Sequence, residues 1–392
     1  MIKKIVYFRY LPLTKKVFRD FYLDELKKAN FEVEYWYLPF ILKVPEGMEE
    51  FYHDSVRIFG SYSELNGAVK HEDKKSTLFI SLQTYGWPVL HLFWLLSRQD
   101  CLLAVYGKNT LPAFSYSSNT KKLLNYSLPE ITKAFKNRIA IHFKKSGLIK
   151  SYDIIFLAGK NGINGYGGKT SIEEKKSVHI LINSDDYDRA RKRAYGERII
   201  EDKYIVFLDE CLPLHPDIVI CNIQAMDAKV YYKEINEFFE KIEKETGMPV
   251  VIAAHPKALI YKQKDFFNGR MVLFGKTVDL VRDSELVLVH DSTSINYAVC
   301  YNKPVISITS DEMERGQAGN HYGTIGLSNY LGTRLIYINK YCADEKERIN
   351  LHEYKIDEER YNMYKYEFLT NPETQDKQSS FLVIEGIKGL DL

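Results

Sequence analysis

The chain has 392 residues, about two to three times the size of a usual single domain, so we expect two domains of comparable length. Its hydrophobic fraction of 45% and charged fraction of 27% are those of an ordinary globular protein, and its formal net charge of +2 does not suggest a nucleic-acid partner. The longest apolar stretch, residues 87–96, is too short to span a bilayer.

The first half alternates short apolar runs with amphipathic ones. The N-terminus reads as a first strand rather than a signal peptide, because its apolar run is very short. The patterns predict strands at residues 5–8, 31–37, 77–82, 102–106, 154–158 and 178–183, and helices at residues 15–29 and 87–97. Alternation of this kind is typical of a parallel sheet with crossover helices.

A basic stretch interrupts this pattern between Lys121 and Lys150. It contains eight Lys or Arg residues and one acid, Glu130. A solvated helical face explains such a run, and so does a surface that meets anionic lipid headgroups or an acidic acceptor. Spacing alone does not separate these interpretations.

The second half repeats the strand and helix alternation more cleanly. Strands are predicted at residues 204–208, 249–254, 271–274, 285–290, 304–309 and 335–338, with helices at residues 231–246, 278–283 and 292–301. A charged, weakly periodic segment at residues 190–203 marks the boundary. We therefore expect an α/β protein of two Rossmann-type doubly wound domains facing a central cleft, with an N-terminal domain over 1–195, a C-terminal domain over 196–370 and a helical tail over 371–392 near the domain seam.

Cysteine usage favours a reducing compartment. The five cysteines are odd in number and widely scattered, with no CxxC pair: Cys101, Cys211, Cys221, Cys300 and Cys342. We expect a cytoplasmic protein, with the inner face of the cytoplasmic membrane as a second location.

Polar side chains follow three predicted strands of the second half. Ligands of open parallel sheets bind at the carboxyl ends of strands. Three strand ends would converge on one cleft there, and they carry Asp209 and Glu210, then His255, Pro256 and Lys257, then His290, Asp291, Ser292, Thr293 and Ser294.

Two of these features together indicate a phosphate site. Ser292, Thr293 and Ser294 precede an apolar helix, where free amides, hydroxyls and the helix dipole attract phosphate, although simple helix capping explains such a sequence as well. His255 offers a compact donor, although a strand-end histidine is more often structural. Their occurrence in consecutive units favours phosphate binding.

An acidic pair could supply the chemistry. Asp209 or Glu210 could act as a general base toward an acceptor hydroxyl, or could cap a loop or bind a ribose. We count Lys257, His290 and the second His-Pro histidine, His215, as further cleft residues.

Two other motifs are weaker. The glycine-rich segment at residues 162–170 resembles a phosphate loop, but Ile163 stands where the spacing requires glycine, so a plain loop is expected. Asp186 and Asp188 have the DxD form that binds a divalent metal in some transferases, although acids at a helix start are the commoner explanation. We expect no metal and no cofactor.

The set of motifs resembles a known family. Asp209-Glu210, His255-Pro256 and Ser292-Thr293-Ser294 resemble the acidic pair, HP motif and paired-hydroxyl motif of bacterial sialyltransferases and related capsule or O-antigen enzymes of the GT-B fold. The longer strings FEVEYWYL, VVIAAHPKA and HDSTSINYAVCYNKPVISIT look like bacterial surface-polysaccharide biosynthesis proteins more broadly. In this chain Cys211 follows the acidic pair in place of glycine, and the hydroxyl motif is Ser-Thr.

The resemblance implies an inverting, metal-independent glycosyltransferase. It would move an acidic sugar from a CMP-linked donor in the second domain to a saccharide or lipid-linked acceptor in the first. The alternatives are a CDP-alditol glycerol- or ribitol-phosphate transferase, a nucleotide-sugar epimerase, a non-catalytic nucleotide-sugar-binding subunit, and a metal-dependent transferase with Asp186 and Asp188 as ligands.

Overall fold

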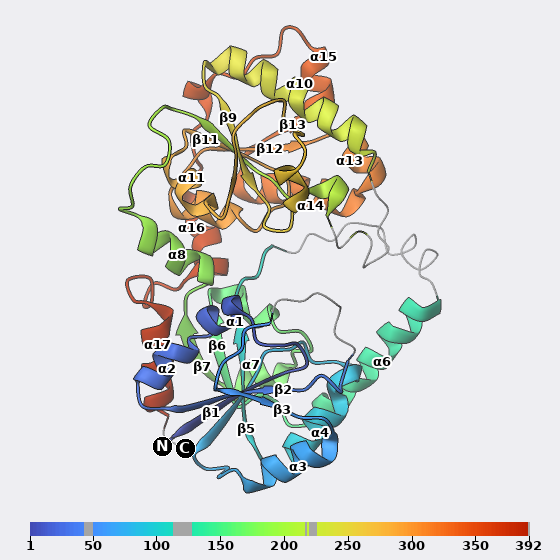
Figure 1. Cartoon of the computed structure of the whole chain (residues 1–392), viewed down its shortest axis with the longest axis vertical. Coiled ribbons are helices and arrows are strands. Elements are labelled where there is room, and N and C mark those ends of the chain that lie inside the picture. The colour runs from blue at the N-terminus through green and yellow to red at the C-terminus, as the bar shows by residue number, and fades with distance from the viewer. Residues whose placement is uncertain (43–49, 113–127, 216–217, 219–225, 391–392) are drawn as a thin grey trace. The chain divides into compact units, whose positions relative to one another are not determined.

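The computed structural model describes residues 1–42, 50–112, 128–215, 218 and 226–390. The chain forms two compact units. The first contains the described residues of 1–110, 118–185 and 366–392, and the second those of 111–117 and 186–365. Each unit is an α/β domain around its own sheet (Figure 1).

The first unit is built on a seven-stranded sheet in which every neighbouring pair is parallel. Its order is β3-β2-β1-β4-β5-β6-β7, so the sequence runs outward in both directions from β1 and β4. The strands are β1 (Lys4–Arg9), β2 (Glu32–Tyr37), β3 (Val56–Ile58), β4 (Thr77–Ser81), β5 (Leu102–Gly107), β6 (Ile154–Ala158) and β7 (Val178–Ile182).

Helices cover both faces of this sheet because alternate strand residues point to opposite sides. Val6 and Phe8 face a core shared with α3 (Tyr62–His71), α4 (Leu90–Arg98) and α6 (Leu128–Lys145). Ile5 and Tyr7 face the other core, with α1 (Lys15–Asp20), α2 (Leu23–Lys28) and α17 (Ser379–Lys388). Shorter elements are η1 (Trp87–Val89), η2 (Lys160–Asn164) and α7 (Ser171–Lys176).

The second unit has a six-stranded sheet of order β10-β9-β8-β11-β12-β13, again with parallel pairs throughout. The strands are β8 (Ile205–Leu208), β9 (Val250–Ala254), β10 (Val272–Phe274), β11 (Leu286–Val289), β12 (Val305–Thr309) and β13 (Arg334–Tyr337). The longer helices are α8 (Asp185–Arg193), α10 (Ala228–Thr246), α11 (Thr277–Asp283), α14 (Ala318–Leu331) and α16 (Glu358–Tyr364). Shorter elements are η3 (Leu212–Leu214), η4 (Leu259–Lys262), α12 (Ile295–Cys300), α13 (Asp311–Gly316), α15 (Ile338–Ala343), η5 (Leu351–Glu353) and the π-helix η6 (Lys365–Leu369).

The units divide at other places than the sequence suggests. We expected boundaries at 195/196 and 370/371, whereas the chain leaves the first unit after Asp185 and returns to it at Tyr366. Asp185 accepts hydrogen bonds from Lys108 (2.6 Å) and Asn109 (2.7 Å) of its own unit. The next residue, Asp186, accepts hydrogen bonds from the second unit instead.

The C-terminal tail belongs to the first unit. We expected residues 371–392 to lie near the domain seam. Val383 and Ile387 of α17 are buried in a core of the first sheet, and Ser379 accepts a hydrogen bond from the amide of Asn183, which follows β7 (3.0 Å). The tail therefore covers the β7 side of the first sheet.

Cys101, Cys211, Cys300 and Cys342 are free thiols, and Cys221 lies outside the described residues. Within the part of the chain that the structure describes, no helix is both long and apolar enough to cross a membrane.

Candidate functional site at the strand ends of the second unit

The topological switch point of the second sheet lies between β8 and β11. Leu208 at the end of β8 pairs with Val289 of β11 on one side and Ala253 of β9 on the other. The residues that follow these strands therefore meet at one edge, as the sequence predicts. In an open α/β sheet this is the place where ligands bind.

Asp209 holds the loops at this edge together. It is only 4% exposed, and its carboxylate accepts hydrogen bonds from the amides of Cys211 (3.0 Å) and His255 (3.2 Å) and from the hydroxyl of Tyr261 (3.1 Å). Burial raises its pKa to about 6. With its oxygens occupied, Asp209 is suited to position the loop that carries His255.

Glu210 is the more accessible member of the acidic pair. It is half-buried, and its Oε1 accepts a hydrogen bond from the amide of Asp291 at 2.9 Å. Burial and the neighbouring charge of Asp291 raise its pKa to about 8. A carboxyl group with a pKa near neutrality can exchange a proton with a bound hydroxyl.

Asp291 is a third carboxyl group at this edge, to which the sequence analysis assigned no role. It is half-buried, and burial raises its pKa to about 6. Its carboxylate lies against Gly323 of α14, which leaves no room for a Cβ at that position. In the sequence, the position of Asp291 directly before Ser292 is the feature that indicates a place at this edge of the sheet.

The two His-Pro histidines come together. The rings of His255 and His215 are 4.9 Å apart, edge to face, and both residues are half-buried. Nδ1 of His255 accepts a hydrogen bond from the amide of Lys257 at 3.2 Å. This bond assigns the proton of the neutral ring to Nε2, which makes that atom a donor. Lys257 itself is exposed.

Ser292, Thr293 and Ser294 form a turn before α12 rather than its first residues. The helix begins at Ile295, three residues later than predicted, because Ile295 and Asn296 bond back to the carbonyls of Ser292 and Thr293. Ser292 Oγ accepts from the Ser294 amide at 3.3 Å. Among the described residues, the amide and the hydroxyl of Thr293 have no hydrogen-bond partner, so both can serve a ligand.

His290 is a core residue and not part of a cleft, so its inclusion among the cleft residues was wrong. It is fully buried, Nδ1 donates to the carbonyl of Ile308 (2.6 Å), and Nε2 accepts from the hydroxyl of Tyr231 (3.0 Å). Burial lowers its pKa to about 4, so it is neutral.

Asp186, the first acid of the DxD motif, has structural partners. Asp186 accepts hydrogen bonds from Asn296 (2.9 Å) and Tyr297 (2.7 Å) of α12 and pairs with Arg189 at 3.1 Å, which ties α8 to α12. Asp188 is 7% exposed. In the described residues, no group of three or more His, Cys, Asp or Glu side chains is arranged to hold a metal ion.

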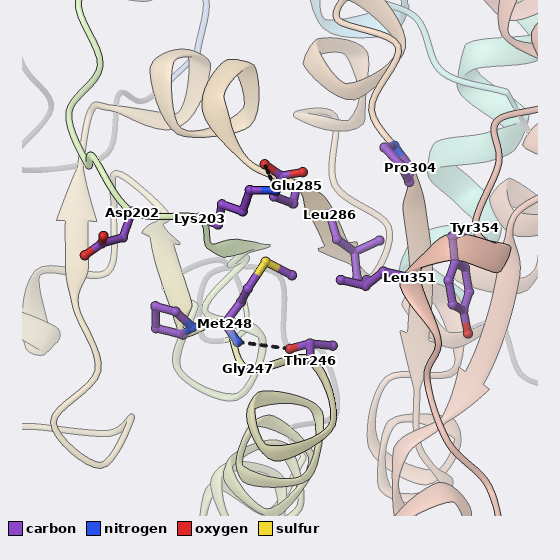
Figure 2. A pocket seen from close by; sticks show the side chains of 11 residues that line it. Asp202, Lys203, Thr246, Gly247, Met248, Glu285, Leu286, Pro304, Leu351 and Tyr354 are labelled. Atoms are coloured by element: carbon purple, nitrogen blue, oxygen red, sulfur yellow. Dashed lines mark hydrogen bonds and ion pairs between the residues drawn. The ribbon is translucent and has the colours of Figure 1, made fainter.

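A separate cavity of about 780 Å³ lies at the opposite edge of this sheet. Figure 2 shows the residues that line it, which include Leu286 at the start of β11 and the residues preceding β8 and β9. Lys203 and Glu285 form an ion pair at its rim, at 3.8 Å. None of the residues that the sequence analysis singled out lines this cavity.

Comparison with known proteins identifies the fold. No protein-family model matches the sequence, and no curated protein matches it. Among solved structures, the chain is similar to a variant of the wall teichoic acid polymerase TagF, with 11% identity over 98% of this chain and 88% of that one and a TM-score of 0.54. It is also similar to a Listeria monocytogenes protein assigned as a UDP-N-acetylglucosamine 2-epimerase, with 12% identity over 99% and 96% of the two chains and a TM-score of 0.51.

The chain has a GT-B-like fold. These similarities, together with two parallel doubly wound sheets of seven and six strands, confirm the fold class expected from the sequence. At such low identity they concern the fold alone.

Proposed function

We propose that this chain is a cytidine-nucleotide-dependent transferase of surface-polymer synthesis that acts as an inverting glycosyltransferase. The donor would be a CMP-linked acidic sugar bound by the second unit, and the acceptor a saccharide or lipid-linked saccharide bound by the first. The observation that carries the proposal is the meeting of Glu210, His255 and Thr293 at the switch point of the second sheet.

His255 and Thr293 would bind the donor phosphate. Nε2–H of His255, the Thr293 amide and its hydroxyl are three donors that a phosphate oxygen accepts well. Ser292 and Ser294 belong to the same turn. These groups would stabilise the negative charge that develops on the leaving phosphate, so the proposed reaction uses no metal ion.

Glu210 is the better candidate for the base than Asp209. The Asp209 oxygens accept three hydrogen bonds from its own unit, whereas only Oε1 of Glu210 accepts one. A base with a pKa of about 8 is mostly protonated at pH 7. We expect turnover to rise with pH between about 7 and 8.

A second candidate is transfer of glycerol or ribitol phosphate from a CDP-alditol. The similarity to TagF, a wall teichoic acid polymerase with a TM-score of 0.54, favours it. The same phosphate site would serve, but a phosphate would travel with the transferred group. The similarity to the Listeria protein supports a third candidate, an epimerase, which needs no acceptor.

Product analysis separates these functions. The protein is incubated with CMP-sialic acid, CDP-glycerol or UDP-N-acetylglucosamine and a lipid-linked saccharide. Products are identified by mass spectrometry, and isomers of equal mass are distinguished by NMR. Released CMP with a glycosylated acceptor supports the proposal. A phosphoalditol on the acceptor supports the second candidate, and an isomerised UDP-sugar supports the third.

Matched variants test the assignment of residues. Glu210→Gln keeps the acceptor for the Asp291 amide and should abolish turnover while leaving donor binding intact. Thr293→Val should weaken donor binding. Lys244→Ala, exposed on α10, is the control. Folded protein that turns over no cytidine donor would refute the proposal, and unchanged turnover by Glu210→Gln would remove Glu210 as the base.

A further inference from the structure

An outward stripe on the first unit carries two exposed tryptophans. The turn η1 leads directly into α4, and Trp87, His91, Trp94 and Arg98 follow one another at spacings of four, three and four residues. Such spacing places side chains on one face of a helix. All four are exposed, with Trp87 at 39% and Trp94 at 43%, whereas the opposite face is buried through Leu92, Phe93, Leu95 and Leu96.

Cations lie directly over this stripe. Arg98 stands 5.1 Å from the ring centre of Trp94, and Nζ of Lys136 stands 6.0 Å from that of Trp87. The amide of Trp87 donates to Asn137 Oδ1 at 3.0 Å, which fixes η1 to α6. The stripe therefore lies next to the part of α6 around Lys136 and Asn137; Figure 1 shows α6 and α4 on the same side of the first unit.

The exposed residues of α6 add further cations and another aromatic ring. Phe135 is 64% exposed, and Lys133, Lys136, Arg138 and Lys145 are exposed around it. The sequence from residue 132 to residue 148 contains no Asp or Glu. We call Trp87, Trp94, Arg98 and these five residues of α6 the aromatic-basic surface.

Not every cation of the basic stretch belongs to this surface. Lys144 is fully buried against Glu173, and Lys150 pairs with Asp100 (3.1 Å) and Asp153 (3.2 Å). Lys121 and Lys122 lie outside the described residues. The surface is thus defined by side chains that are exposed to solvent and not by sequence composition.

We propose that the aromatic-basic surface binds the headgroup region of an anionic phospholipid bilayer. Cations attract anionic headgroups, while indole and phenyl rings gain by entering the boundary between headgroups and acyl chains. A nucleic-acid duplex, with its bases stacked inside, or a purely acidic protein surface would pair with the cations but would offer the three exposed rings no apolar layer to enter. The inference stands independently of the reaction proposed above.

The three tryptophans provide a direct test on the unmodified protein. Trp36 is 1% exposed in the core, whereas Trp87 and Trp94 belong to the surface. Vesicles of phosphatidylglycerol and phosphatidylcholine with brominated acyl chains should quench the emission of Trp87 and Trp94 and spare that of Trp36. Vesicle binding without quenching would overturn the proposal, and so would absence of binding.

Charge reversal provides the matched comparison. The test variant reverses three cations of α6: Lys133→Glu, Lys136→Glu and Arg138→Glu. The control reverses three exposed lysines of α10: Lys229→Glu, Lys233→Glu and Lys244→Glu. Each cation near an anionic bilayer contributes about fivefold in affinity, so the test variant should bind about 100-fold more weakly in vesicle sedimentation.

The apolar contribution is tested with Trp87→Ala and Trp94→Ala, checked for folding by circular dichroism. Both should lower vesicle affinity at unchanged net charge. Equal losses in the α10 control, equal binding to pure phosphatidylcholine vesicles, or tryptophan variants that bind as tightly as the parent would each refute the bilayer as partner.

Discussion

Lys144 and Lys145 are neighbours in the basic stretch, but the structure gives them opposite environments. Lys144 is fully buried and pairs with the fully buried Glu173, and its Nζ lies 4.1 Å from the ring centre of Tyr152. Lys145 is exposed. Replacing Lys144 by Met keeps the length of the stem but leaves the Glu173 carboxylate buried without its counter-charge.

Breaking a buried ion pair from one side costs about 3–5 kcal/mol. For a unit of about 200 residues each kcal/mol lowers Tm by about 2–4 °C, so Lys144→Met should lower the Tm of the first unit by roughly 6–20 °C. Lys145→Met should change stability by no more than about 0.5 kcal/mol. Calorimetry or urea unfolding measures both.

A double variant tests the cause. Glu173 also accepts a hydrogen bond from the amide of Thr170 at 2.7 Å. Gln at this position keeps an acceptor without the charge, so Lys144→Met/Glu173→Gln should recover most of the loss. If Lys144→Met were as stable as Lys145→Met, the buried Lys144–Glu173 ion pair would not stabilise the first unit.

Two further outcomes follow from the site and from the backbone. Glu210 keeps its proton up to a pH of about 8 in the fold but loses it near 4.5 when unfolded, so it lowers the stability of the second unit as pH rises through that window. The pKa of His290 is lowered from 6.5 to about 4, so His290 raises the stability of the second unit as pH rises, but only below pH 6.5. Between pH 6.5 and 8, Tm should therefore fall in the parent and fall less in Glu210→Gln; equal slopes would contradict the pKa assigned to Glu210. Gly159, at φ +66°, lies where a Cβ would stand 2.6 Å from the carbonyl oxygen of Glu367, so Gly159→Ala should lower the Tm of the first unit more than Gly147→Ala, which has φ +80° and open space around it. Equal losses would show that backbone strain alone matters at Gly159.

Apolar runs predicted most of the sheet strands because a buried parallel strand needs an uninterrupted apolar sequence. Strands β4, β9 and β12 are buried at every position and lie where the sequence places them. Strand β3 was missed, because it has three residues and none is buried. The predicted helix over residues 15–29 is two helices, since Tyr22 adopts a left-handed conformation at φ 62° between them.

Convergence of the site was predictable, but the role of each carboxyl group was not. The strand-end rule brings the residues after β8, β9 and β11 together without knowledge of any side-chain contact. The difference between Asp209 and Glu210 depends on Tyr261, 52 residues away in the chain, which donates to Asp209. No local pattern contains that information, and the same is true of Lys144 within its basic run.

Nucleotide binding by the second unit is the central claim, and thermal unfolding with CMP, CDP, UDP, GDP and ADP tests it most directly. A ligand at a concentration of 100 times its Kd stabilises the folded protein by about 2.7 kcal/mol. We predict that a cytidine nucleotide raises Tm by several degrees, and that His255→Ala and Thr293→Val reduce this shift without lowering the Tm of the free protein. If no nucleotide stabilises the folded protein, or if both variants keep the full shift, the phosphate site proposed at His255 and Thr293 is wrong.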